Sequence, residues 1–218
     1  MTLTLPLELG DSAERAPTKL GEGALHLPGF AKPLEASLLA QIEMLAQDAP
    51  FRRMSTRGGH KMSVALTNCG PLGWVSDESG YRYSAHDPLT AKPWPPMPAM
   101  FAELAQRAAL AAAFSGFEPD ACLVNCYEPG AKMSLHQDRD ERDKRQPIVS
   151  VSLGVSAQFL WGGNERNAPT RTITLLSGDV VVFGGASRLI FHGIKRLAVQ
   201  THPLTGERRY NLTFRRAR

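Results

Sequence analysis

The chain has 218 residues, a length that suits one domain with a substantial hydrophobic core. Hydrophobic residues make up 43%, which is ordinary for a globular protein, and the net charge of +4 is compatible with a polyanionic partner without being evidence for one. No window approaches the ~18 apolar residues of a membrane span, and no secretory signal opens the chain. The three cysteines form no CxxC pair and are expected to be reduced thiols. These features predict a cytoplasmic protein that has no membrane partner.

The first half of the chain is predicted to contain two helices and an irregular segment. Residues 1–20 contain polar residues and prolines and are expected to form a loose N-terminal arm, followed by a single domain over residues 21–218. Apolar residues at helical spacing, with a proline near the start, predict a helix over residues 33–48. An alanine-rich run predicts a second helix over residues 99–115, ending near Gly116. Between them, residues 50–97 are rich in Gly, Pro and Ser, with only short extended pieces such as residues 62–67.

After the second helix the apolar pattern changes to a period of two residues. Turns rich in Gly, Asn, Asp and Pro divide this half into short predicted strands over residues 121–127, 148–153, 158–161, 171–176, 179–183, 189–192 and 210–214. Seven or more short strands at such spacing indicate a sandwich or a jelly roll. Because helices come first and strands follow, the predicted fold class is α+β.

The run Leu135-His136-Gln137-Asp138 carries a candidate metal site, together with a distant histidine, His192. In an extended segment residues i and i+2 point the same way, so His136 and Asp138 can reach one metal ion while Gln137 points away. Two histidines and one carboxylate can hold Fe(II) on one face and leave the other positions open for oxygen and a co-substrate. Taken alone, the same residues also fit a chance pair and a structural histidine.

The C-terminal run 209–215 has two chemically distinct faces. Strand alternation puts Arg209, Asn211, Thr213 and Arg215 on one face, and Tyr210, Leu212 and Phe214 on the other. Two guanidiniums and an amide suit a ligand with two carboxylates, such as 2-oxoglutarate, since Arg binds carboxylate through a planar two-pronged contact. A basic edge strand is the other interpretation, which Arg208, Arg216 and Arg218 favour.

With these motifs together, the chain resembles the AlkB-type Fe(II)/2-oxoglutarate-dependent dioxygenases, which remove alkyl lesions from nucleobases. The resemblance runs from about residue 23 to residue 215 and rests on the segments 125–138, 147–154, 178–185, 188–194 and 209–215. It implies a double-stranded β-helix, or jelly roll, as the catalytic core over residues 120–218. It also implies N-terminal helices and a nucleotide-recognition lid over residues 50–97.

The resemblance implies roles for the cofactor residues. His136, Asp138 and His192 would be the metal ligands, and Fe(II) follows from the resemblance because the residues themselves would also bind Mn, Co or Ni. The 2-oxoglutarate contacts would come from Asn125, Tyr127, Arg209, Asn211 and Arg215. We assign Arg209 to the far carboxylate and Arg215 to the metal-side end, an order that the sequence alone does not settle. No catalytic residue beyond the metal ligands is expected.

Substrate contacts are implied for the irregular region and for two polar positions. They are Trp74, Tyr81 and Tyr83 around a flipped base, Asp140 against a cationic base, Arg166 as a further contact, and Arg52, Arg53, Arg57 and Lys61 against phosphates. One position departs from the family: His60 stands where a tyrosine-like aromatic is expected. This departure concerns the preference among bases and not the chemistry.

The implied activity is the oxidative demethylation of N-alkylated bases such as 1-methyladenine and 3-methylcytosine. It would use Fe(II), O2 and 2-oxoglutarate and release succinate, CO2 and formaldehyde. The partners would be single-stranded DNA by preference and double-stranded DNA, with RNA left open, and the protein is expected to be a monomer. Two alternatives stay open: an Fe(II)/2-oxoglutarate hydroxylase of a protein or small molecule, and a catalytically silent nucleic-acid-binding module on the same fold.

Overall fold

The computed structural model describes residues 15–218, and their strands form two facing sheets and a separate hairpin. Neighbouring strands within each sheet are antiparallel. The major sheet has the order β1 (Thr18–Gly21), β2 (Ala24–Leu27), β11 (Val180–Phe183), β8 (Ile148–Gly154), β13 (Arg209–Arg215), β6 (Ala121–Tyr127) and β3 (Ala65–Cys69). The minor sheet has the order β10 (Arg171–Leu175), β9 (Ala157–Trp161), β12 (His192–Ile194) and β7 (Met133–His136). The hairpin consists of β4 (Gly73–Asp77) and β5 (Gly80–Ser84).

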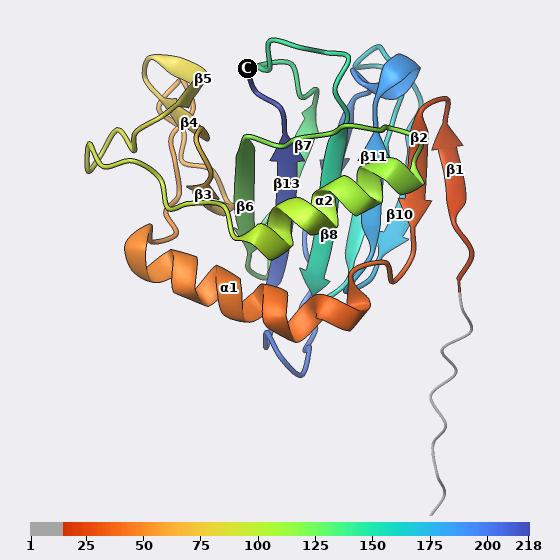
Figure 1. The fold of residues 1–218 in the computed structure, drawn as a ribbon, viewed down its shortest axis with the longest axis horizontal. Coiled ribbons are helices and arrows are strands. Elements are labelled where there is room, and N and C mark those ends of the chain that lie inside the picture. Colours follow the sequence, from red (N-terminus) through yellow and green to blue (C-terminus); the bar gives the residue numbers. More distant parts are fainter. Residues whose placement is uncertain (1–14) are drawn as a thin grey trace, which may run out of the picture.

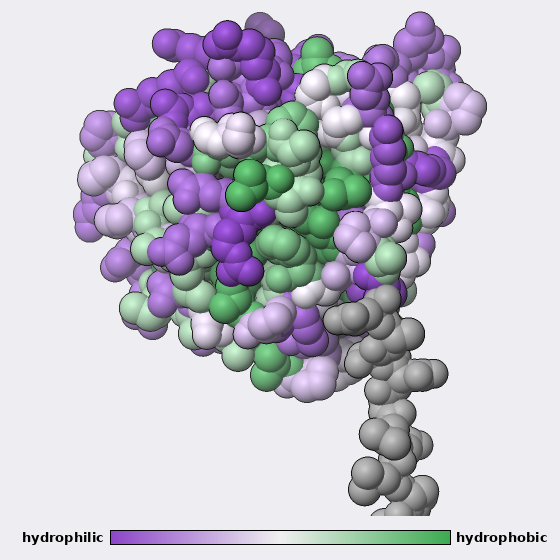
Figure 2. All heavy atoms as spheres, turned by 45° about the vertical axis from the view of Figure 1, so that its right-hand side comes forward, coloured by the Kyte–Doolittle hydropathy of each residue, from purple (hydrophilic) through white to green (hydrophobic). Residues whose placement is uncertain are grey.

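Two helices cover one face of the major sheet, as Figure 1 shows. The first, α1 (Glu35–Asp48), follows a short 3₁₀ turn, η1 (Lys32–Leu34), and the second is α2 (Ala99–Ala111). Leu38 and Phe101 from these helices share one buried cluster with Leu212 and Phe214 of β13. Figure 2 shows this side of the molecule obliquely, with apolar residues gathered at the centre of the face and hydrophilic ones around them. No helix among residues 15–218 is long and apolar enough to cross a membrane.

The two sheets enclose a second core, and this arrangement decides the two faces of β13. The apolar residues Tyr210, Leu212 and Phe214 form a face separate from the arginines, as predicted, and the structure shows that this face packs on the helix side. The polar residues Arg209 and Arg215 point to the opposite side, into the space between the sheets. The α+β class and the jelly-roll fold are therefore confirmed.

Several boundaries differ from the prediction. The second helix ends at Ala111 and not at residue 115, because Ala113 has a φ of +67° and the chain leaves the helix there. The predicted strand 189–192 is wrong for most of its length: the 3₁₀ turn η2 (Gly185–Ser187) continues as a hydrogen-bonded turn to Ile190, and β12 begins only at His192.

The N-terminal prediction is corrected where the structure describes it. The part of the expected loose arm that covers residues 1–14 lies outside the described residues. At its other end, residues 18–20 belong to strand β1, which pairs with β2. The region 50–97 is also more regular than expected: it contains β3, which joins the major sheet beside β6, and the whole β4–β5 hairpin.

Candidate active site

A cavity of about 740 Å³ lies between the two sheets. Its wall takes polar side chains from β6 and β13 of the major sheet, from β7 and β12 of the minor sheet, and from the β4–β5 hairpin. Most of the site residues predicted from the sequence line it: Trp74, Tyr81, Asn125, Tyr127, His136, Asp138, Asp140, Arg166, His192, Arg209, Asn211 and Arg215. The fold thus brings motifs that are far apart in the sequence around one space.

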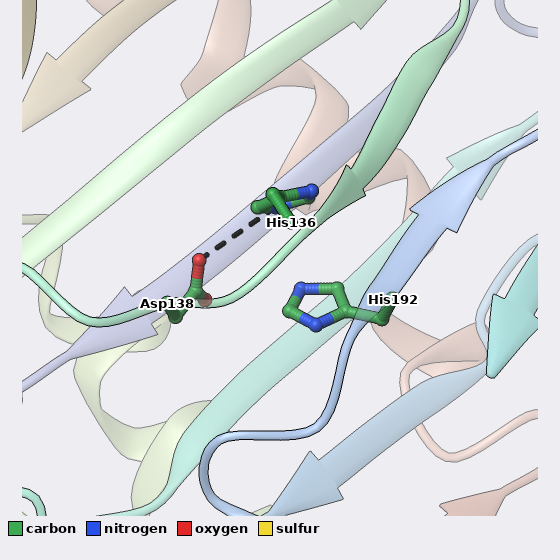
Figure 3. A group of neighbouring side chains, drawn as sticks. All are labelled: His136, Asp138 and His192. Carbon is green, nitrogen blue, oxygen red and sulfur yellow. Dashed lines mark ion pairs between the residues drawn. The ribbon is translucent and has the colours of Figure 1, made fainter. Parts of the chain in front are cut away.

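Three of these residues form a group suited to a metal ion. His136 is the last residue of β7, His192 is the first of β12, and the two are cross-strand partners. Asp138 follows His136 by two residues, in the loop after β7, and the three side chains face one another in Figure 3. One ligand atom from each lies within 4.8 Å of the others, with His136 Nε2 and Asp138 Oδ1 3.7 Å apart. The predicted ligand set is therefore assembled.

The backbone fixes the orientation of both imidazoles. The Nδ1 atom of His136 lies 2.9 Å from the carbonyl oxygen of Ser134, and that of His192 lies 3.0 Å from the carbonyl oxygen of Ile190. A carbonyl oxygen can only accept, so each Nδ1 carries the proton and donates it. In the neutral imidazole the Nε2 atom then has a free lone pair that can bind a metal ion, as in many histidine-ligated centres.

A glycine lets the two ligand strands come together. A Cβ atom built on Gly193 would lie 2.6 Å from the carbonyl oxygen of Met133, which is closer than real contacts allow. The register also shifts between His192 and Ile194 along β7, as in a β-bulge. Gly193 is thus required for the close approach that places His192 opposite His136.

The electrostatics of the group favour the forms that bind metal. Burial and the neighbouring His136 lower the pKa of His192 to about 4, so its imidazole is neutral near pH 7. Burial by itself would raise the pKa of Asp138, but the positive charge of the Arg215 guanidinium, with that of the imidazoles when they are protonated, outweighs burial and lowers the pKa below its ordinary value. A neutral histidine and an ionised carboxylate are the protonation states that a metal ion needs.

The major-sheet wall of the cavity carries buried polar atoms without partners among the described residues. They are Asn125 Oδ1, Arg209 Nε, Arg209 Nη1 and Arg215 Nη1. Such atoms are costly unless a ligand or ordered water meets them. Within residues 15–218 the Arg209 guanidinium donates to Ser152 Oγ and pairs with no carboxylate, and burial lowers its pKa. The wall therefore fits a bound anion, and with the His-Asp-His group it fits 2-oxoglutarate and a divalent metal.

The hairpin supplies the aromatic side of the cavity mouth. Trp74 and Tyr81 stack with ring centroids 5.5 Å apart and 16° between their planes. The Nε1 atom of Trp74 donates to Asp140 Oδ2 at 2.8 Å. Arg166 stands at the cavity wall with its guanidinium 4.9 Å over the ring of Phe191. These positions agree with a surface that holds a planar cationic ring.

Three other residues predicted to contact the substrate are paired with acidic side chains. Tyr83 lies outside the lining of this cavity, and its hydroxyl donates to Glu141 Oε1 at 2.6 Å. Arg52 is bound by Asp87 through two contacts of 2.5 and 2.6 Å, and Arg53 pairs with Glu128 at 2.6 Å. Arg52 and Arg53 thus already have carboxylate partners, and their contact with phosphates stays a prediction.

The other lid positions are open to solvent. Arg57, His60 and Lys61 are exposed, and Lys61 lines the cavity. His60, the position that departs from the family, lies outside the cavity lining.

Two buried charges at the site were not assigned a role from the sequence. Glu141 lies three residues after Asp138, and Arg188 is the first residue of the segment 188–194, which contains His192. Both side chains are buried and form an ion pair of 2.8 Å. Arg188 lies inside the segment 188–194 that carries His192, whereas Glu141 lies beyond the segment 125–138, and nothing in the local sequence marks either side chain as buried.

The fold and the His-Asp-His site define the class of protein: an Fe(II)- and 2-oxoglutarate-dependent oxygenase. The family model of the 2OG-Fe(II) oxygenase superfamily matches residues 23–215, and the chain belongs to this superfamily, within its AlkB-type dioxygenases.

Known proteins of this type match the chain closely. It is 56% identical to "Alpha-ketoglutarate-dependent dioxygenase AlkB" of Salmonella typhimurium, covering 94% of this chain and 96% of that protein. It is 38% identical to the Arabidopsis thaliana "DNA N(6)-methyladenine demethylase ALKBH1C", covering 66% of this chain and 37% of that one. The solved structure "The structure of OsALKBH1" superposes with a TM-score of 0.81 at 32% identity, covering 92% of this chain and all of that chain.

Proposed function

We propose that this chain is an oxidative demethylase that repairs N-alkylated bases, such as 1-methyladenine and 3-methylcytosine, in DNA. The observation that carries the proposal is the placement of the stacked pair Trp74 and Tyr81 and the carboxylate Asp140 on the same cavity as the His-Asp-His group. A base methylated at N1 of adenine or N3 of cytosine is planar and positively charged. Aromatic faces and a carboxylate are the groups that bind such a ring. The Arabidopsis relative is named as a demethylase of N(6)-methyladenine in DNA.

We assign the cofactor contacts as follows. His136, Asp138 and His192 would hold Fe(II), while Asn125, Tyr127, Arg209, Asn211 and Arg215 would hold 2-oxoglutarate. Arg215 reaches Asp138 and is thus suited to the metal-side end. Arg209, which has no carboxylate partner among the described residues and lies 4.9 Å over the Tyr127 ring, is suited to the far carboxylate.

The chemistry divides between the cofactors and the protein. Fe(II) with O2 and 2-oxoglutarate supplies the oxidation of the N-methyl group to a hydroxymethyl group, which leaves the base as formaldehyde while succinate and CO2 are formed. The protein orients the groups that would hold the metal. The carbonyl oxygens of Ser134 and Ile190 fix the two imidazoles, and Arg215 fixes the carboxylate of Asp138. The aromatic pair and Asp140 hold the base, with Arg166 as a further contact at the mouth of the cavity. No other side chain has to move a proton, so no further catalytic residue is assigned.

The remaining assignments belong to the same proposal. Residues 21–218 form one domain with 50–97 as the nucleotide-recognition lid and 120–218 as the catalytic core. Single-stranded DNA is the preferred substrate, because a base must leave its stack to reach the cavity, and double-stranded DNA and RNA are further substrates to compare. The protein acts as a monomer in the cytoplasm.

Mass analysis of a single-stranded oligonucleotide with one 1-methyladenine tests the proposal. Incubation with the protein, Fe(II) and 2-oxoglutarate should remove one methyl group per lesion and release one formaldehyde. Omitting 2-oxoglutarate, or using His136→Ala, should abolish the reaction. Uncoupled consumption of 2-oxoglutarate with an unchanged oligonucleotide would contradict the proposed substrate, and a parallel incubation with a peptide mixture would then test hydroxylation of protein.

A further inference from the structure

The loop after Asp138 carries a buried carboxylate, Glu141, that is not one of the assigned metal ligands. Only 4% of this residue is exposed. Its Oε2 atom accepts a hydrogen bond from Arg188 Nη2 at 2.8 Å. Its Oε1 atom accepts from the Tyr83 hydroxyl at 2.6 Å and lies 3.2 Å from Arg215 Nε. Both carboxylate oxygens of Glu141 therefore contact side chains, and these come from three separate segments of the chain.

Arg188 anchors Glu141 from the protein side. Its Nη1 atom donates to the backbone carbonyl of Asp138 at 2.5 Å, and its Nε atom donates to the carbonyl of Gln146 at 2.9 Å. Since Nη2 binds Glu141, one buried guanidinium ties together the beginning, middle and end of the loop 138–146. Arg188 therefore fixes the place of both carboxylates that approach Arg215.

Arg215 is shared between two carboxylates. Its Nη2 atom donates to Asp138 Oδ2 at 2.9 Å, and its Nε atom lies 3.2 Å from both Asp138 Oδ2 and Glu141 Oε1. The two acids and the two guanidiniums of Arg188 and Arg215 balance in formal charge, so the buried cluster is neutral as a whole. The remaining Nη1 of Arg215 has no protein partner within the described residues, and Arg215 lines the cavity.

The same loop fastens the aromatic hairpin. Trp74 and Tyr83 are cross-strand partners in β4 and β5. Trp74 donates to Asp140 and Tyr83 donates to Glu141, so two neighbouring loop residues each hold one strand of the hairpin. Burial raises the pKa of the Tyr83 phenol well above its ordinary value, so the hydroxyl keeps its proton and remains a donor to Glu141. The loop thus joins the base-binding surface to the metal ligand.

We propose that Glu141 is a positioning residue that shares Arg215 with Asp138, so that Asp138 keeps an oxygen free for the metal and Arg215 keeps Nη1 directed at 2-oxoglutarate. Arg188 holds Glu141 in place from the core, and Tyr83 holds it from the hairpin. Without Glu141, Asp138 is the only carboxylate in contact with Arg215 among the described residues. The guanidinium then competes with the metal ion for Asp138, and metal affinity falls. The inference rests on the ligand assignment made above for the proposed function.

Cobalt titration of the metal-free protein tests this role without any nucleic acid. Glu141→Gln keeps the size of the side chain and an acceptor for Tyr83 but removes the charge that shares Arg215. The dissociation constant for Co(II), followed by its visible absorption, should rise about tenfold or more, as for other groups that orient metal ligands. The affinity of the Co(II)-loaded protein for 2-oxoglutarate should fall in the same variant, because the Arg215 guanidinium is no longer held in the orientation that directs Nη1 towards 2-oxoglutarate.

Asp179→Asn is the matched control. Asp179 is also a fully buried acid, held by Arg15 and His26, but it lies outside the cavity lining. This variant should lose thermal stability and keep its Co(II) dissociation constant within about twofold of wild type. An equal loss of Co(II) affinity in Asp179→Asn would overturn the proposal, since the effect would then be general destabilisation.

The remaining outcomes separate this inference from the proposed site. If Glu141→Gln binds Co(II) and 2-oxoglutarate like wild type while His136→Ala loses Co(II), the positioning role is overturned and the metal site stands. If His136→Ala also binds like wild type, the ligand assignment fails and the inference fails with it. Should Glu141→Gln not fold, Tyr83→Phe removes only one hydrogen bond and should raise the Co(II) dissociation constant roughly threefold. An unchanged constant in Tyr83→Phe would then overturn the proposal.

Discussion

His136 and His192 are directly opposite each other on neighbouring antiparallel strands, with their ring centroids 4.4 Å apart. The pairing is set by backbone hydrogen bonding between β7 and β12 and by the lack of a side chain at Gly193. The two imidazoles are therefore preorganised before any metal ion binds. Preorganisation of this kind makes each ligand necessary, because two remaining ligands bind a divalent ion much more weakly than three.

Replacement of any one ligand should abolish turnover. We expect His136→Ala, Asp138→Ala and His192→Ala each to weaken Co(II) binding by more than about 100-fold, beyond the effect of removing a group that only orients a ligand. Asp143→Ala is the control, because Asp143 lies five residues after Asp138 but its carboxylate pairs with the exposed Arg145 and lies outside the cavity lining. Metal titration and methyl removal should be measured on the same samples. Near wild-type values for any one of the three variants would remove that residue from the ligand set.

Arg209→Lys should raise the concentration of 2-oxoglutarate needed for half-maximal activity. Lysine keeps the charge but loses the two-pronged contact, and a charge-assisted hydrogen bond is worth about 1.5 kcal/mol, so roughly a tenfold rise is expected. Arg208→Lys is the matched control, since Arg208 is the exposed neighbour of a buried Arg209. An equal response of both variants would place the dicarboxylate elsewhere.

Asp140→Asn should change the choice between lesions. The amide can still accept the hydrogen bond from Trp74, so the hairpin stays attached, but the charge that attracts a cationic base is lost. The rate of methyl removal from 1-methyladenine should fall about fivefold more than the rate of repair of the neutral ethenoadenine. This factor corresponds to the ~1 kcal/mol by which a hydrogen bond to a charged group exceeds one between neutral groups. Both lesions should be placed in the same strand at fixed salt. Parallel losses would mean that Asp140 does not sense the charge of the base.

The lid cations should separate into two kinds. Arg57 and Lys61 are exposed and free to meet phosphates, so replacing both with Ala should flatten the salt dependence of single-strand binding by a slope of about 0.7 per lost contact.

Arg52 should behave as a structural residue. Its guanidinium is held by Asp87 and lies over Trp94, so Arg52→Ala should cost about 1–3 kcal/mol of folding free energy and leave the salt slope unchanged. Denaturant unfolding and binding at several salt concentrations distinguish the two cases. A reduced slope in Arg52→Ala would mean that its pair with Asp87 opens on binding.

Asp179 should make folding stability depend on acid pH. Burial by itself would raise the pKa of Asp179, but hydrogen bonds from His26, Arg15 and backbone amides lower it from 3.8 to about 2. Because the pKa of Asp179 is lower in the folded state than in the unfolded state, its ionised form stabilises the fold by about 2 kcal/mol above pH 4. This contribution is lost as the pH falls through 2. Wild type should therefore exceed Asp179→Asn in unfolding free energy at pH 6, and the gap should close towards pH 2. A gap that stays constant with pH would assign the difference to packing.

The sequence by itself determined much of this protein. Period-two alternation over residues 209–215 predicted which side chains of β13 face the core and which face the cavity, because side chains in any strand alternate. The spacing of His136 and Asp138 predicted that both reach one site, and they do, although β7 ends at His136 and Asp138 lies in the loop beyond it. The helices and most strands of the second half also follow from local periodicity.

Only the tertiary structure decided which distant groups meet. Strand order decides that β7 pairs with β12. It also brings together polar and charged groups from remote segments: Arg215 with Asp138, Arg52 with Asp87, and Tyr83 with Glu141. Strand β7 was not predicted as a strand because its four residues are too short a run for alternation to stand out, and it is held by pairing with β12. The buried pair of Glu141 and Arg188 also belongs to this level, because a charged residue has no local signal for burial until its partner is in place.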